Sequence, residues 1–136
     1  MEISVNSKCI CGSDKKYKKC CKEFHDGKLP KTALELMRSR FSAYALGYAN
    51  YIIETTHKDN CEFTHNRQTW LSDINNFCEY TDFQGLTILD FKDGNKESFV
   101  SFKAKLSQNG LDASFTEKSR FLKVDGKWYY IDGIFL

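Results

Sequence analysis

Four cysteines within thirteen residues form the part of the sequence with the clearest chemistry. Cys9 and Cys11 make a C-x-C pair, and Cys20 and Cys21 make an adjacent pair after eight further residues. A structural Zn²⁺ ion takes four thiolate or imidazole ligands in a closed tetrahedron, with sulfur about 2.3 Å away. The linker starts with a Gly-Ser turn, so both pairs can converge on one ion. We therefore predict a zinc site, with iron as the alternative metal, on Cys9, Cys11, Cys20 and Cys21.

A disulfide framework is the alternative for these cysteines. Adjacent and C-x-C disulfides close very small rings, which normal disulfide geometry tolerates poorly. The N-terminal residues lack the apolar segment of a secretory signal, and no apolar run approaches the roughly 18 residues of a membrane-spanning helix. We therefore expect a cytoplasmic protein with reduced thiols. Cys61 and Cys78 are expected to be ordinary thiols, and His25 is an alternative ligand in place of Cys20 or Cys21.

Charge is distributed unevenly along the chain. Residues 1–31 hold eight lysines and four acidic residues, a net charge of +4, whereas the remainder holds 12 basic and 14 acidic residues, a net charge of −2. A basic segment favours an acidic partner, such as a protein or ribosomal surface. Nucleic acid is a weaker alternative, because most aromatic residues are expected in the core. The lysines could equally serve only to offset the four thiolates.

Helices are predicted first, between residues 32 and 77. Thr32 and Glu35 have the spacing of a capping box, so a helix should begin near Thr32 and end at Gly47. Apolar residues at helical spacing predict a second, short helix over 48–57 and a third over 64–77.

Strands are predicted from residue 80 onward. Asp93-Gly94, Asn109-Gly110 and Asp125-Gly126 follow one another at equal intervals, and such dipeptides favour two-residue hairpin turns. They predict an antiparallel meander of four strands, over 84–92, 96–108, 111–124 and 127–134. Long strands twist, so we expect an α+β fold in which a curved sheet packs against three helices.

Two resemblances cover nearly the whole chain. Residues 9–21, Cys-Ile-Cys-Gly-Ser-Asp-Lys-Lys-Tyr-Lys-Lys-Cys-Cys, resemble the SEC-C motif, a small zinc knuckle. Residues 36–44 and 119–133 resemble the YchJ family (UPF0225), which has an NTF2-like fold behind a SEC-C knuckle. The resemblance implies a SEC-C zinc knuckle over 1–30 and an NTF2-like domain over 31–136. Ile10 and Asp14 depart from the proline and glycine expected in the motif.

The resemblance also implies classes of function. SEC-C knuckles resemble docking elements for protein partners, including a chaperone and ribosomal surfaces. NTF2-like domains bind small molecules, act as enzymes or serve as interaction modules, and many form homodimers, so a homodimer is expected as well. The fold alone does not choose between these classes.

A polar residue on an apolar strand face marks a candidate pocket. Alternation over 113–121 places Glu117 on the face shared with Phe115 and Phe121. A buried carboxylate needs a partner, and Arg38 or Arg40 is the expected one. The alternatives are a polar ligand pocket without chemistry, or a catalytic pocket with Glu117 as general base. The candidate pocket residues are Arg38, Arg40, Tyr44, His57, Glu117 and Tyr130.

Two hypotheses follow. The favoured one is an interaction or adaptor protein, with the basic knuckle docking on a partner. The other is a small-molecule-binding protein or enzyme that uses a cavity inside the sheet. A cone filled with apolar side chains would favour the first, and a cavity in which Glu117 lacks an arginine partner would favour the second.

Overall fold

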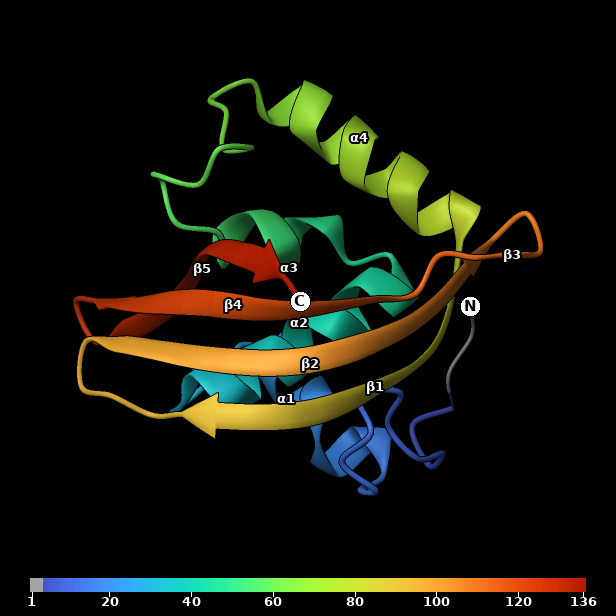
Figure 1. Cartoon of the computed structure of the whole chain (residues 1–136), viewed down its shortest axis with the longest axis horizontal. Coiled ribbons are helices and arrows are strands. Elements are labelled where there is room, and N and C mark those ends of the chain that lie inside the picture. Colours follow the sequence, from blue (N-terminus) through green and yellow to red (C-terminus); the bar gives the residue numbers. More distant parts are fainter. Residues whose placement is uncertain (1–3) are drawn as a thin grey trace.

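The computed structural model describes residues 4–136 and has helices before strands, as predicted (Figure 1). An antiparallel sheet has the order β1-β2-β4-β5, and β3 pairs with β2. Helix α2 packs against β1, β2 and β5, behind the curved sheet in Figure 1. The predicted α+β class and curved sheet are therefore confirmed. The elements are a 3₁₀ turn at Tyr17–Lys19, α1 (Cys21–His25), α2 (Ala33–Leu46), α3 (Ala49–Glu54), α4 (Arg67–Tyr80), β1 (Thr81–Lys92), β2 (Glu97–Gln108), β3 (Leu111–Asp112), β4 (Phe115–Val124) and β5 (Lys127–Phe135).

The ends of α2 lie where the sequence predicts them. The Thr32 side chain accepts a hydrogen bond from the Glu35 backbone N–H at 3.1 Å, and Gly47 ends the helix in the left-handed region at φ 77°. Helix α4 begins three residues later than predicted, because Asn66 is its N-cap and accepts from the Thr69 N–H at 3.2 Å. The helix ends at Tyr80 and β1 begins at Thr81, so no loop separates the two elements.

Two of the three predicted turns have the expected conformation. Both residues of Asn109-Gly110 and of Asp125-Gly126 have positive φ, as two-residue hairpin turns need. The prediction for Asp93-Gly94 is wrong, because neither residue has positive φ and the loop extends over 93–96. Ser98 stabilises this longer loop, since its hydroxyl accepts from the Gly94 N–H at 3.0 Å and donates to Asp93 at 3.3 Å.

The third predicted strand, 111–124, is divided into β3 and β4. The Leu106 N–H donates to the Ser114 hydroxyl at 3.1 Å, so a side chain takes the place of a backbone partner at this point. The register against β2 is the same on both sides of this interruption, because Asp112 pairs with Ser107 and Phe115 pairs with Ala104.

The main core lies between α2 and the inner face of the sheet. Val100, Phe102, Ala104 and Leu106 of β2 are buried there together with Phe121, as their alternation predicts. A second, smaller core joins α3 and α4 around Ile52, Ile53, Trp70 and Ile74. Within residues 4–136, no helix combines the length and hydropathy that a membrane span requires.

Candidate metal centre and cavity

The four predicted metal ligands lie together. The sulfur atoms of Cys9, Cys11, Cys20 and Cys21 all lie within 4.8 Å of one another. The Cys11 and Cys20 sulfurs are 3.6 Å apart, and those of Cys20 and Cys21 are 4.0 Å apart. All of these cysteines are free thiols, so they do not form the alternative disulfide framework.

Their spacing fits a tetrahedral ion. Four sulfurs at about 2.3 Å from a central Zn²⁺ stand about 3.8 Å from one another, close to the two sulfur–sulfur distances above. Hydroxyl groups contact the sulfurs from outside, at 3.1 Å from Ser13 to Cys20 and 3.4 Å from Ser42 to Cys9. Such contacts orient and stabilise thiolate ligands. The residues therefore fit a closed four-thiolate site, which would hold its metal for structure and leave no coordination position for a substrate.

The four thiols compete with one another for ionisation. Hydrogen bonds from neighbouring sulfurs, above all Cys11, lower the pKa of Cys9 and lower the pKa of Cys20 to about 6. The pKa of Cys11 is raised, chiefly by Cys20, and the pKa of Cys21 is raised, chiefly by Cys11. Some sulfurs thus ionise at the expense of the others. A divalent cation removes this competition, because a metal deprotonates its thiol ligands.

One face of α2 holds this cysteine knuckle, by which we mean residues 9–21. The Arg38 guanidinium donates to the Cys11 carbonyl at 2.6 Å, and Leu46 packs against the cysteine cluster. Arg38, Ser42 and Leu46 are spaced four residues apart, so they share one side of the helix. A Cβ atom on Gly12, which has φ 79°, would collide with the Leu86 carbonyl oxygen of β1. The knuckle is therefore packed closely against both α2 and the β1 edge.

His25 is not in the cysteine cluster. Its Nε2 donates to the Ser39 carbonyl at 2.9 Å, and its Nδ1 accepts from the Tyr17 hydroxyl at 2.7 Å. Burial lowers the pKa of His25, which keeps the ring neutral and suits this donor–acceptor pair. The expectation that His25 could replace Cys20 or Cys21 is wrong. The residue joins the knuckle to α2 instead.

The opposite face of α2 lines a cavity of about 390 Å³ inside the curved sheet. Four of the six candidate pocket residues lie in its wall: Arg40, Tyr44, Glu117 and Tyr130. Arg38 and His57 do not. Arg38 points to the knuckle, and the His57 Nδ1 accepts from the Asp59 N–H at 3.0 Å. Most of the remaining wall is aromatic or aliphatic, from Met37, Phe41, Phe77, Phe83, Phe102, Ala104, Leu106, Phe115 and Phe135.

Glu117 has no arginine partner among the described residues, contrary to the sequence expectation. The Ser119 hydroxyl donates to its Oε2, and the Tyr130 hydroxyl lies 3.4 Å from the same oxygen. Gly133 leaves room for this carboxylate, because a Cβ atom there would collide with the Glu117 side chain. Ser119 and Gly133 are site residues that the candidate list missed. The alternation over 113–121 already places Ser119 on the face of Glu117, whereas Gly133 depends on the register of β5 against β4.

Arg40 is buried and held by the end of α3. Its Nη1 donates to the Ile52 carbonyl at 3.1 Å, to Thr55 at 2.8 Å and to Thr56 at 3.1 Å. Its guanidinium carbon also lies 4.8 Å from the centre of the Tyr130 ring. Carbonyl groups and the helix dipole stabilise the cation there. This explains why Arg40 does not need Glu117 as a partner.

The two tyrosines of the cavity, Tyr44 and Tyr130, are partly buried. Burial raises the pKa of Tyr130, with a smaller contribution from the charge of Glu117, and burial raises the pKa of Tyr44 as well. Both hydroxyl groups are therefore neutral donors at neutral pH.

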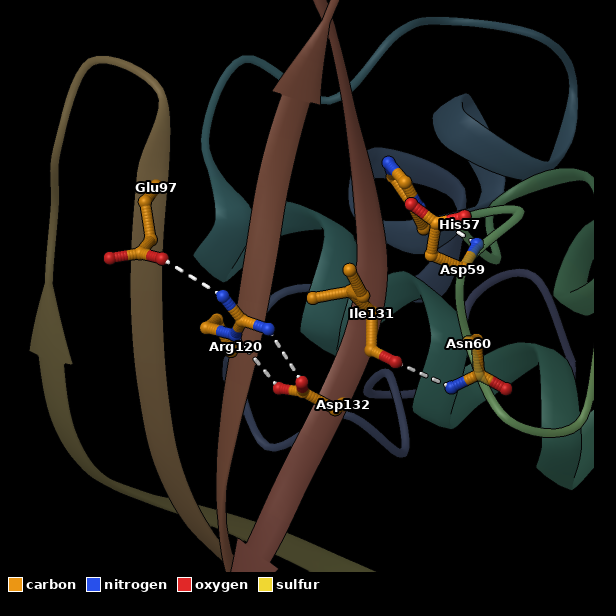
Figure 2. A network of polar contacts seen from close by, with 7 residues as sticks. All are labelled: His57, Asp59, Asn60, Glu97, Arg120, Ile131 and Asp132. Atoms are coloured by element: carbon orange, nitrogen blue, oxygen red, sulfur yellow. Dashed lines mark hydrogen bonds and ion pairs between the residues drawn. The ribbon is translucent and has the colours of Figure 1, made fainter.

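A polar network fixes β5 and the loop at the cavity mouth (Figure 2). Arg120 binds both oxygens of Asp132, at 2.9 and 2.6 Å, and lies 3.2 Å from Glu97, which ties β2, β4 and β5 together. Ile131 is the extra residue of a bulge, and its carbonyl accepts from the Asn60 side chain at 2.6 Å. The loop after α3 is thus attached to the sheet beside the cavity.

The comparisons with known proteins agree with these two regions. A family described as "YchJ, middle NTF2-like domain" matches residues 32–133, and the SEC-C motif matches residues 6–23. The chain belongs to the YchJ family. Members of this family that resemble it include a UPF0225 protein of Serratia proteamaculans, which is 40% identical over 130 residues and aligns with 92% of this chain and 81% of that protein.

Solved structures give the same result for the fold. The solution structure of a SEC-C motif containing protein from Rhodopseudomonas palustris has a TM-score of 0.80 and 30% identity, and the match covers 96% of this chain and 99% of that one. The crystal structure of a SEC-C motif containing protein from Psychrobacter arcticus has a TM-score of 0.78 and 25% identity, with 94% and 82% covered.

Proposed function

We propose that this YchJ-family protein binds a small, largely apolar molecule in the cavity of its NTF2-like domain, with Glu117 as the polar recognition group. The supporting observation is a carboxylate that faces an aromatic cavity without an ion-pair partner among residues 4–136. Apolar cavities of roughly 300–1,000 Å³ with a few convergent polar groups are typical ligand sites. A volume of about 390 Å³ suits a ligand near the lower end of that range.

In this proposal the domain over residues 1–30, which contains the cysteine knuckle, has a structural role, and the NTF2-like domain over 31–136 carries the binding function. The knuckle would hold Zn²⁺, although a four-thiolate site also accepts iron. Four reduced thiols are most easily maintained in the cytoplasm, which is the location we propose. An enzymatic role with Glu117 as general base would require the same binding step first.

A thermal-shift screen with small aromatic alcohols, amides and amines tests the binding proposal. Ligands should raise the Tm of the wild type, and Glu117→Gln should weaken the shift given by compounds that donate hydrogen bonds. Glu79→Gln, on the exposed end of α4, is the matched control. The proposal is wrong if no compound raises the Tm, or if both variants respond equally to every donor.

A second candidate function, docking on an acidic partner, is favoured by the knuckle surface. Lys15, Lys16, Lys18 and Lys19 are all exposed, and none forms an ion pair within the described part of the chain. A pull-down with a variant carrying glutamine at these four positions tests this role. The control variant carries glutamine at Lys92, Lys103 and Lys105 of the sheet and at Lys96 of the loop between β1 and β2. Docking is excluded if both variants retain the same partners as the wild type.

A further inference from the structure

Two of the charged residues that line the cavity, Arg40 and Glu117, have opposite charges and both contact one tyrosine. The Tyr130 hydroxyl lies 3.4 Å from Glu117 Oε2, while the face of the same ring carries the Arg40 guanidinium, 4.8 Å from the ring centre. Glu117 and Arg40 both line the cavity, yet no ion pair joins them within residues 4–136. The ring of Tyr130 therefore separates the cation from the anion.

Each charged group has hydrogen-bonding capacity that the protein leaves unused. Both contacts to Glu117 are made at Oε2, so Oε1 has no protein partner among the described residues. All three hydrogen bonds from Arg40 leave from Nη1, so Nε and Nη2 have none either. No fully buried, unpartnered polar atom is found in the described chain. These atoms are consequently open to water, and a ligand can replace that water.

The two groups are also held in fixed positions. Arg40 is anchored at the end of α3, and its side chain is only 6% exposed. Glu117 is held by Ser119 and by the space above Gly133. Charged groups that are already oriented lose little entropy when a ligand binds. Most of the remaining wall is apolar, with Phe115 packed edge-on against both Phe102 and Phe135. The wall has two other carboxylates, of which Asp132 is paired with Arg120 and Glu62 is exposed.

We propose that the cavity selects a zwitterionic ligand with an apolar side chain, of the class of an aromatic or aliphatic α-amino acid. Its ammonium group would donate to Glu117 Oε1, its carboxylate would accept from Nε and Nη2 of Arg40, and its side chain would contact the phenylalanine wall. A molecule with only a cation would leave Nε and Nη2 of Arg40 without an acceptor, and one with only an anion would leave Oε1 of Glu117 without a donor. This inference rests on the binding function proposed above.

Matched probes test the ligand class in the zinc-loaded full-length protein. L-phenylalanine carries both charges, 2-phenylethylamine lacks the carboxylate, 3-phenylpropionate lacks the ammonium, and 2-phenylethanol lacks both. Binding would be followed by NMR shifts of the Tyr130 and Gly133 amides. Because a hydrogen bond to a charged group contributes about 1.5–3 kcal/mol, L-phenylalanine should bind at least about tenfold more tightly than either singly charged probe.

Glu117→Gln should weaken the binding of L-phenylalanine about tenfold and leave the affinity for 3-phenylpropionate unchanged. The contribution of Arg40 is tested by removing the carboxylate from the ligand. A substitution of Arg40 itself could prevent folding, because Arg40 holds the end of α3. The inference is overturned if either singly charged probe binds as tightly as the amino acid. If 2-phenylethanol alone shifts the cavity amides, the ligand class is wrong but the binding function stands. If no probe shifts them, both proposals fail.

Discussion

The cysteine knuckle and the cavity lie on opposite faces of the same helix, and they are built by different means. Arg38 and Ser42 turn toward the sulfurs, whereas Arg40 and Tyr44 turn toward the cavity. The knuckle takes all four of its candidate metal ligands from thirteen consecutive residues. The cavity takes Arg40 and Tyr44 from α2, and Glu117 and Tyr130 from β4 and β5, more than seventy residues further along the chain. A local site can be predicted from residue types and spacing, but a dispersed one depends on how the elements pack.

The largest effect is expected from removing one metal ligand. Cys11→Ser should abolish stoichiometric metal binding and lower the stability by several kcal/mol, because structural zinc contributes on the order of 10 kcal/mol to folding in small domains. Elemental analysis and thermal unfolding measure both effects. Cys61→Ser changes an exposed cysteine outside the cluster and should change neither. A metal content of one ion per chain in Cys11→Ser would contradict the four-ligand site.

The next effect concerns the cavity alone. Gly133→Ala should displace the Glu117 carboxylate, destabilise the fold by about 1–3 kcal/mol and weaken ligand binding, because its Cβ has no room. Gly85→Ala is the matched control, since a Cβ there meets nothing within 4 Å. Urea unfolding measures the difference. Equal stability of the two variants would show that Glu117 is not held by Gly133.

The attachment of the knuckle to α2 should have an effect of similar or smaller size. Arg38→Ala removes the hydrogen bond to the Cys11 carbonyl and should cost about 1–2 kcal/mol. The loss should appear as faster amide exchange in residues 9–20, with the β2 amides unchanged. Arg67→Ala, at an exposed position on α4, should leave the amide exchange rates of the knuckle unchanged. Uniformly faster exchange in Arg38→Ala would mean that knuckle and body unfold together.

The smallest effect concerns the knuckle turn. Asp14 has φ 67°, a left-handed conformation that glycine adopts more easily. Asp14→Gly should therefore stabilise the protein slightly, by about 0.5 kcal/mol, because its ion pair with Lys8 is exposed and contributes little. Asp26→Gly, at an ordinary φ of −87°, should not stabilise. Thermal unfolding distinguishes them, and a lower Tm for Asp14→Gly would contradict this explanation.

The difference between the local knuckle and the dispersed cavity also explains which features could be predicted from the sequence. The capping box at Thr32 and the Asn-Gly and Asp-Gly turns at 109 and 125 act locally, so their positions were predictable. The alternation that placed Glu117 on the inner face was predictable for the same reason. Its partner was not, because Arg40 finds a local alternative at the end of α3. The hydrogen bond from the Leu106 N–H to the Ser114 hydroxyl and the bulge at Ile131 both depend on contacts with a neighbouring strand. Residue patterns within one strand do not specify such contacts.

The division of roles between knuckle and cavity is tested most directly by an amide shift map of the zinc-loaded protein titrated with 2-phenylethanol. We expect shifts at residues of β2, β4 and β5 that line the cavity, among them Ala104, Glu117 and Tyr130. Residues 9–21 should remain unchanged, because a closed four-sulfur site has no position for a ligand. Shifts confined to the knuckle, with a silent cavity, would contradict the account.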